Sequence, residues 1–322
     1  MNEYYRNLCP EWAKEIHLEN DLVLGDDSDS LLSCNLLEEM TNGLWKVNYF
    51  YDFKDIYRAN KTTERIIGVD MAFTKQGVRC FDNHVSRAYP GEKYNENCMN
   101  LNFYKDNISA TKNYYKKYPF STLMLIMAYY DIPLPKSRAG KEIILAIDSA
   151  HKGHYTNNSF FKQIHTDWLE LLGFGSLVDI LDKRDMSFFQ KVQNYFGLGE
   201  KVYLNDNGLL QTRIDLEALQ PYLDWDLGLS DKKFKQIGSL VREGHNVGDK
   251  RLPDKKDIIS LAYTGKDYVS YTHRGWLFAF YVWLWLSLTI WPILTIINLG
   301  GKYYEKIILF LLQQKCIGVF IK

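Results

Sequence analysis

The stretch LVLGDDSDSLLSC, residues 22–34, gives the first indication of the fold. Its apolar start predicts a buried strand that ends near Gly25. The apolar residues that follow recur at helical spacing and predict a helix over residues 30–40, with Asp29 or Ser30 as its N-cap. Asp26, Asp27 and Asp29 therefore lie where a buried strand passes into a helix.

Further segments repeat this strand pattern. WKVNYFY (45–51), RIIGVD (65–70) and GVRCFD (77–82) are each predicted to be strands, and KEIILAIDSA (141–150) is predicted to hold a buried strand over 143–147. Residues 111–130 are predicted to be largely helical. Strands that alternate with helices predict the α/β class with a parallel sheet.

The remainder of the chain suggests a second portion. Residues 159–174, 177–196 and 229–244 are predicted to be helices, and residues 257–272 are predicted to form a β-hairpin. We therefore expect an α/β domain over 1–156, a smaller and mainly helical portion with a C-terminal hairpin over 157–275, and an apolar tail over 276–322.

The tail has a distinct composition. Residues 276–299 carry no charge over a length that can cross a bilayer core of about 30 Å as a helix, so they are a candidate transmembrane helix. A buried C-terminal helix or pair of strands is the alternative. The N-terminus is charged and lacks the apolar stretch of a secretory signal. We expect a cytoplasmic catalytic domain, anchored to a membrane if the tail spans one.

Composition excludes some classes of function. The 322 residues carry a formal net charge of zero, so there is no general basic excess for binding a nucleic-acid backbone, and any phosphate binding must be local. Apolar residues make up 46% of the chain, which is enough for a sizeable core. The five cysteines include no C-x-x-C pair, which argues against a zinc site or a thioredoxin-like motif and favours a reducing compartment.

Aspartates follow the predicted strands. They are Asp27 and Asp29, then Asp70, then Asp82 in an Asp-Asn-His triplet, and finally Asp148. The carboxyl ends of parallel strands meet at one edge of a sheet, where carboxylates would repel each other unless cations lay among them. Oxygen ligands with a histidine favour Mn²⁺ or Mg²⁺, and a pair of such ions serves phosphoester hydrolysis. Taken singly, each aspartate can equally be a helix cap or a turn former.

The order of these residues resembles the DHH phosphoesterase superfamily, which includes RecJ-type exonucleases, oligoribonucleases, cyclic-dinucleotide phosphodiesterases and family II pyrophosphatases. Asp27-Ser28-Asp29-Ser30 followed by Ser33 is similar to the first motif, D-x-D-G-x-x-S, with serine in place of glycine. Asp70 matches the second motif, Asp82-Asn83-His84 the third and Asp148 the fourth. The resemblance covers residues 20–156.

The resemblance implies a role for each of these residues. Asp27 would bind one metal ion, Asp29 the other, Asp70 would bridge the two, and Asp148 would complete the second site. Asn83 replaces a histidine that is a metal ligand in the family, and an amide oxygen binds Mn²⁺ more weakly than imidazole does. His84 occupies the place of the second histidine, which usually meets the phosphate, and it can also take over as a ligand.

Four more residues complete the candidate site. Many members of the family carry a further ligand for the first metal where this chain has Val23 and Gly25, which leaves Asp26 as the only nearby substitute. The first motif places Ser33 towards the substrate. In DSAHKGHY (148–155), His151, Lys152 and His154 follow Asp148, where they can contact a phosphate or act as general acid. Histidines in an ordinary polar turn are the alternative.

The sequence therefore predicts a metal-dependent phosphoesterase that acts on a nucleic acid, an oligonucleotide or a signalling nucleotide through water activated by two Mn²⁺ or Mg²⁺ ions. One alternative is a degenerate DHH-like protein that binds a nucleotide or a partner without hydrolysis. The other is a phosphatase of the haloacid-dehalogenase type, with Asp27 as nucleophile and Asp29 as acid/base. The substrate itself and the oligomeric state are not predicted.

Overall fold

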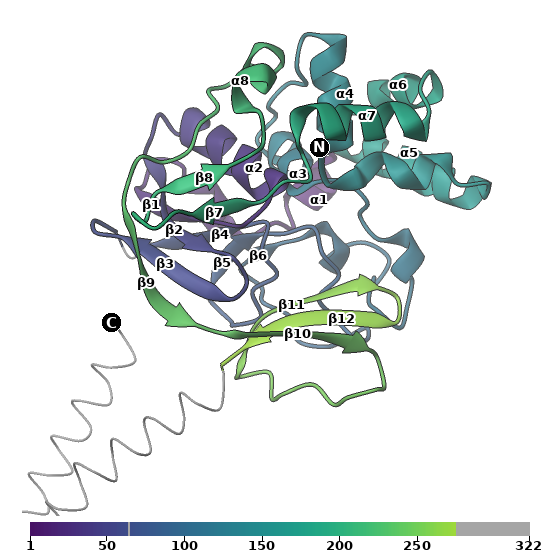
Figure 1. Cartoon of the computed structure of the whole chain (residues 1–322). Coiled ribbons are helices and arrows are strands. Elements are labelled where there is room, and N and C mark those ends of the chain that lie inside the picture. Colours follow the sequence, from purple (N-terminus) through teal and green to yellow (C-terminus); the bar gives the residue numbers. More distant parts are fainter. Residues whose placement is uncertain (64, 275–322) are drawn as a thin grey trace, which may run out of the picture. The chain divides into compact units, whose positions relative to one another are not determined.

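A seven-stranded sheet forms the centre of the computed structural model, which describes residues 1–63 and 65–274 (Figure 1). The strand order is β6-β5-β4-β1-β2-β3-β9. The five strands from β6 to β2 are parallel, and β3 and β9 are antiparallel to their neighbours. The chain thus belongs to the α/β class with a mostly parallel sheet. The strands are β1 (Asn20–Leu24), β2 (Trp45–Tyr51), β3 (Asp55–Ala59), β4 (Ile66–Val69), β5 (Arg79–Phe81), β6 (Cys98–Met99) and β9 (Phe234–Ser239).

Strand β1 and the helix after it form as the opening stretch of sequence predicts. All five residues of β1 are buried, as expected for a strand covered on both faces. Helix α2 (Ser28–Met40) follows, and its N-cap is Asp27, whose side chain accepts a hydrogen bond from the backbone N–H of Ser30. The prediction of Asp29 or Ser30 as the cap was wrong, because the helix begins two residues earlier than its apolar pattern.

The direction of strand addition reverses at β1. The chain passes from β1 through α2 to β2 on one side, and later adds β4, β5 and β6 in turn on the other side. Ligands of open parallel sheets bind at the carboxyl ends of the strands beside such a reversal. The link from β4 to β5 holds no helix, and the two strands are parallel.

The two faces of the sheet pack against different partners. Leu22 and Leu24 of β1 belong to the main core on one face, whereas Val23 contacts Tyr49 and Tyr51 on the other. A second sheet, in the order β10-β12-β11, lies near this second face, and the hydroxyl of Tyr51 hydrogen-bonds to Thr272 of β12. Its strands are β10 (Val241–Asn246), β11 (Ile258–Gly265) and β12 (Tyr268–His273). The hairpin predicted over 257–272 is confirmed.

Helices gather towards one end of the main sheet (Figure 1). Trp168 of α5 and Phe189 of α7 belong to the same hydrophobic core as Leu24 and Leu37. Residues Met1–Arg274 form one compact unit, with no division at residue 156.

The other elements are α1 (Glu3–Arg6), α3 (Thr122–Tyr129), α4 (Arg138–Ala146), α5 (Ser159–Leu172), α6 (Val178–Asp182), α7 (Met186–Phe196), α8 (Leu216–Leu219), β7 (Val202–Leu204), β8 (Leu210–Thr212) and the 3₁₀ helices η1 (Glu11–Lys14), η2 (Leu101–Phe103), η3 (Tyr114–Lys116), η4 (Ile147–Tyr155), η5 (Gly175–Leu177) and η6 (Gln220–Tyr222).

Two of the predicted elements were wrong. Residues 143–147, predicted as a strand, lie in α4 and at the start of η4, because Ser137 caps a helix whose last turn is buried on all sides. Residues 229–244, predicted as a helix, contain β9 and β10, because β9 pairs with the open edge of β3. Tertiary pairing here overrides the helix preference of a Lys- and Gln-containing segment.

The candidate transmembrane helix 276–299 and the whole tail 276–322 lie outside the described residues. Within residues 1–63 and 65–274, no helix combines the length and the apolar character that crossing a membrane requires.

The hydroxyl of Ser30 ties the start of α2 to two strands. It accepts a hydrogen bond from the Gly25 N–H at 2.7 Å and donates one to the Val69 carbonyl at 2.8 Å, and all three residues are buried. We expect Ser30→Ala to lower the free energy of unfolding by about 1–3 kcal/mol, because both backbone groups lose their buried partner. Urea denaturation of the full chain, followed by tryptophan fluorescence, measures this change.

Ser187→Ala is the matched control, because Ser187 is exposed and its hydroxyl bonds only to the Asp185 carboxylate among the contacts described. Its effect should stay within about 0.5 kcal/mol. Equal stabilities of the two variants would contradict the structural role given to Ser30.

Candidate metal site

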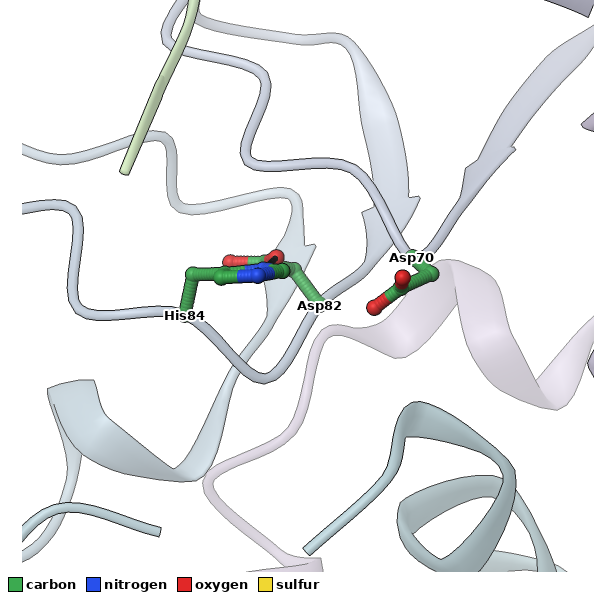
Figure 2. Close-up of side chains that lie close together, drawn as sticks. All are labelled: Asp70, Asp82 and His84. Atoms are coloured by element: carbon green, nitrogen blue, oxygen red, sulfur yellow. Dashed lines mark hydrogen bonds and ion pairs between the residues drawn. The ribbon is translucent and has the colours of Figure 1, made fainter. Parts of the chain in front are cut away.

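Three acidic side chains follow three neighbouring parallel strands. Asp27 comes after β1, Asp70 directly after β4 and Asp82 directly after β5. One ligand atom from each of Asp70, Asp82 and His84 lies within 4.8 Å of the others. Figure 2 shows the His84 imidazole alongside the Asp82 carboxylate, with the Asp70 carboxylate beside them. The fold thus brings together residues that are up to fourteen positions apart in the sequence.

The Asp82 carboxylate is fully buried and orients His84. Asp82 Oδ1 lies 2.8 Å from His84 Nδ1. Asn100 Nδ2 donates hydrogen bonds to Asp82 Oδ2 at 2.6 Å and to the His84 carbonyl at 2.7 Å. A carboxylate on one imidazole nitrogen is the usual way in which proteins orient a metal-binding histidine, with the other nitrogen towards the ion.

The pKa of His84 also reflects the negative charge around it. Burial disfavours the charged imidazolium, but the adjacent Asp82 carboxylate and the charge of Asp70 outweigh this effect and raise the pKa of His84 to about 10. An arrangement that stabilises a positive charge on a histidine also stabilises a metal cation in its place.

Helix α3 positions the carboxylates on the other side of the site. The backbone N–H groups of Thr122 and Leu123 donate to the two oxygens of Asp29 at 2.7 and 2.9 Å, at the positive end of the helix dipole. The Thr122 hydroxyl donates to Asp70 Oδ1 at 2.7 Å, and the Ser33 hydroxyl lies 3.3 Å from Asp29 Oδ1. In this structure Ser33 therefore orients Asp29.

Asp148 reaches the site from the end of a helix rather than from a strand. It has a left-handed backbone with φ of 52°, as residues that terminate α-helices commonly do, and it follows α4 after one residue. Asp70 has φ of 60° and is likewise left-handed. Non-glycine residues seldom adopt this conformation, although aspartate tolerates it better than most.

Asn83 holds Asp148 through its amide nitrogen. Asn83 Nδ2 donates to Asp148 Oδ2 and to the carbonyl of Phe120, each at 3.1 Å. Because both partners are acceptors, the nitrogen must face them, and both amide hydrogens are used. Asn83 therefore positions one of the carboxylates in this structure.

The carboxylates strongly oppose one another's ionisation. Burial raises the pKa of Asp29 well above its ordinary value, and the charges of Asp148 and Asp27 raise it further. Burial likewise raises the pKa of Asp70 well above its usual range, with Asp29 and Asp27 adding to the effect, and burial raises that of Asp27. Like charges at short range in a poorly solvated site favour either protons or a metal cation among them.

Asp26 pairs with a cation of the chain. Its carboxylate lies 2.9 Å from Lys201 Nζ, and its carbonyl accepts a hydrogen bond from the Val202 N–H of β7. The structure gives Asp26 an ion-pair partner on the neighbouring loop and does not group it with Asp70, Asp82 and His84.

His151 and His154 make their described contacts away from the carboxylates. The His151 ring stacks on Phe189 with centroids 4.7 Å apart, and its Nδ1 lies 3.3 Å from the Leu145 carbonyl. His154 Nε2 lies 3.2 Å from Asp182 Oδ1, and Lys152 is exposed. The structure does not bring these three residues into the cluster, so their catalytic and substrate roles stay predictions outside the site that we propose.

Sequence reasoning missed three residues of the site. Asn100 and Thr122 hold Asp82, His84 and Asp70, and the positive charge of Lys117 lies near enough to Asp148 to influence it. Thr122 follows Ser121, the N-cap of α3, so its backbone N–H has no acceptor within the helix, which is a weak signal. Asn100 lies in an asparagine-containing loop with no pattern that singles it out.

Comparisons of the chain with protein-family models, with curated proteins and with solved structures found no match.

His165 is a buried core residue of α5 rather than a residue on an open helix face. Only 3% of it is exposed, its ring meets the Phe120 ring edge-on, and burial, with smaller effects from His154 and His151, lowers its pKa to about 3. Because the unfolded chain binds this proton near pH 6.5 and the folded chain does not, stability falls as the pH drops below 6.5.

We expect this histidine to reduce the free energy of unfolding by about 2–3 kcal/mol between pH 6.5 and pH 4.5. The measurement is the difference between wild type and His165→Gln in urea denaturation with EDTA at both pH values, so that contributions common to both proteins cancel. The glutamine variant should lose less stability over this range, and an equal loss in the two proteins would show that His165 is protonated in the folded state as well.

Proposed function

We propose that this protein is a metal-dependent phosphoesterase that hydrolyses phosphodiester bonds in a nucleic acid, an oligonucleotide or a signalling nucleotide. The observation that carries the proposal is the cluster of Asp70, Asp82 and His84, whose ligand atoms lie within 4.8 Å of one another at the carboxyl edge of the sheet. Asp29 lies close enough to raise the pKa of Asp70.

The donor set fits a hard divalent cation. Carboxylate oxygens with one imidazole suit Mn²⁺ or Mg²⁺, and thiol ligands, which would favour zinc, are not part of the cluster. Asp70 supports a bridging position, because its carboxylate belongs to the cluster with Asp82 and His84 and also interacts with Asp29 and Asp27. We propose that Asp70 and His84 hold one ion, with Asp82 orienting His84 through its Nδ1, and that Asp27, Asp29, Asp70 and Asp148 hold a second.

The chain's own groups then have defined tasks. Two bound ions would supply an activated water and neutralise charge on the phosphate oxygens. Asn100 fixes Asp82 and the His84 backbone, the N-terminus of α3 fixes Asp29, and Asn83 fixes Asp148. Such supporting hydrogen bonds keep ligands in place before the substrate arrives. Lys117, beside Asp148, supplies a positive charge at the edge of the site.

The resemblance to DHH phosphoesterases agrees with this arrangement in the order and place of its aspartates. Asp27, Asp70 and Asp82 follow adjacent strands, and Asp148 meets Asn83 of the third motif. The proposed ligands differ from those of the family. Both amide hydrogens of Asn83 bond to Asp148 and to the Phe120 carbonyl, and the Asp82 carboxylate bonds to the His84 ring. We propose a DHH-like site with an altered ligand set.

A second candidate is a DHH-like protein that binds a metal ion and a nucleotide without hydrolysis. The ion pair of Asp26 with Lys201 favours it, because the one nearby substitute for the missing ligand of the first metal is engaged elsewhere. The haloacid-dehalogenase alternative gains no such support, because the described contacts of Asp27 and Asp29 do not favour a nucleophile or an acid/base role over a ligand role. A cytoplasmic site of action, with residues 276–299 as an anchor, is proposed from the sequence alone.

Asp70→Asn tests the proposed function. With Mn²⁺ present, we expect the full chain to hydrolyse at least one of single-stranded DNA, short RNA, a cyclic dinucleotide or pyrophosphate. The variant should lose more than the roughly 10–100-fold typical of changes to residues that merely support a ligand, because it removes a charged ligand shared by two ions. Initial rates with Mn²⁺ and with EDTA measure this.

The matched control is Asp254→Asn, which removes a carboxylate that is 68% exposed and distant in sequence from the cluster. Its rate should equal that of wild type. Unchanged hydrolysis by Asp70→Asn would refute the bridging carboxylate, whereas Mn²⁺ binding with no hydrolysis of any of the four substrates would leave only the second candidate.

A further inference from the structure

A cavity of about 300 Å³ opens beside the 3₁₀ helix η3. Three segments far apart in the sequence form its walls: the loop that contains η3, the beginning of α5 and the turn between β11 and β12. Tyr115 and Lys116 come from the first segment, Phe160 from the second and Lys266 from the third. The volume is at the lower end of the range for small-molecule sites and suits a ligand the size of a nucleobase.

The aromatic side chains of this cavity are open to solvent. Tyr115 is 54% exposed and Phe160 is 42% exposed, although large aromatic residues normally bury most of their surface. The Tyr115 ring meets the Phe161 ring edge-on with centroids 5.9 Å apart, which gives it support from one side. Exposed, supported aromatic rings at a cavity provide faces on which a nucleobase can stack.

Cations accompany the aromatic rings. Lys266 Nζ lies 5.9 Å from the Tyr115 centroid, and Lys116 also lines the cavity. Lys116 and Lys266 belong to no described ion pair, whereas Lys162 nearby on α5 is paired with Asp182. In a chain of zero net charge this is a local concentration of positive charge next to stacking faces, the combination that binds single-stranded nucleic acids and nucleotides.

Two series of neighbouring residues link the cavity to the candidate metal site. Lys117 directly follows the cavity residue Lys116, and its charge interacts with Asp148. The hydroxyl of Tyr114, another cavity residue, donates to the Tyr263 carbonyl at 3.0 Å, and the Tyr263 N–H donates to the carbonyl of Val85, the residue after His84. Neighbouring segments thus carry the cavity and the carboxylates, as a nucleotide substrate with its phosphate at the carboxylates would require.

We propose that this cavity binds a nucleobase of the substrate, stacked on Tyr115 and Phe160, while Lys116 and Lys266 hold a flanking phosphate. The identity of the ligand as a nucleotide rests on the proposed function. The consequence is that the enzyme prefers nucleotide substrates to pyrophosphate, because only a substrate with a base gains the stacking contact.

Binding without metal tests the subsite separately from hydrolysis. The probes are the dinucleotide pApA and its abasic counterpart, titrated into the full chain in EDTA by isothermal titration calorimetry. We expect pApA to bind more tightly than the abasic probe. Tyr115→Ala should weaken binding of pApA by about 5- to 100-fold and leave the abasic probe unaffected, whereas Tyr115→Phe should retain wild-type affinity.

Two further variants act as controls. Tyr195→Ala removes a tyrosine of α7 that is 75% exposed and does not line the cavity, and it should bind pApA as wild type does. Lys266→Ala should weaken both probes and reduce the dependence of binding on salt. Circular dichroism checks that each variant is folded.

The outcomes separate this proposal from the proposed function. Equal affinity of wild type for the two probes, no binding of pApA, or wild-type affinity for pApA in Tyr115→Ala would each overturn the subsite, even if Mn²⁺-dependent hydrolysis is present. Base-dependent binding that Tyr115→Ala weakens, together with no hydrolysis under Mn²⁺, would support the subsite and refute the phosphoesterase activity.

Discussion

The mutual repulsion of carboxylates at one edge of the sheet is the constraint on which the rest of the site depends. Asp29 and Asp70 are almost fully buried, and burial raises the pKa of both. The charges of Asp148 and Asp27 raise the pKa of Asp29 further, and those of Asp29 and Asp27 raise the pKa of Asp70 further. The fold offsets this cost with fixed dipoles, namely the N–H groups at the start of α3, the Thr122 hydroxyl and the Asn83 amide. The pKa values of Asp29 and Asp70 remain well above the usual range all the same, so the site favours either protons or a cation among the carboxylates.

Much of the sheet was predictable because its strands are short apolar runs bounded by polar residues. The strands around Leu22, Val47 and Ile67 were predicted for that reason, and so was the α/β class. The pattern failed where local preference competed with tertiary contacts. The apolar run 143–147 fits a buried strand and a fully buried helical turn equally well, and its periodicity does not distinguish the two. The segment that contains β9 becomes a strand because β3 offers it an open edge, which no local pattern reveals.

The site was predictable where its residues follow strands and not where they support other residues. Asp70 and Asp82 are placed by the ends of β4 and β5, so that their meeting follows from the topology. Asn100 and Thr122 act through hydrogen bonds across distances of about 18 and 52 residues, which a single sequence does not encode in any spacing. His151 and His154 follow Asp148 within η4, and their described contacts are with Phe189, the Leu145 carbonyl and Asp182.

The most direct test of the cation site is a calorimetric titration of Mn²⁺ into the full chain and into Asp82→Asn. The variant keeps the shape of the side chain but removes its negative charge, and with it the ion pair to His84. Wild type should bind Mn²⁺ with release of a proton from His84, visible as a dependence of the binding heat on the ionisation enthalpy of the buffer. The variant should bind at least about 10-fold more weakly. Equal binding by both proteins, or no Mn²⁺ binding by wild type, would contradict the account.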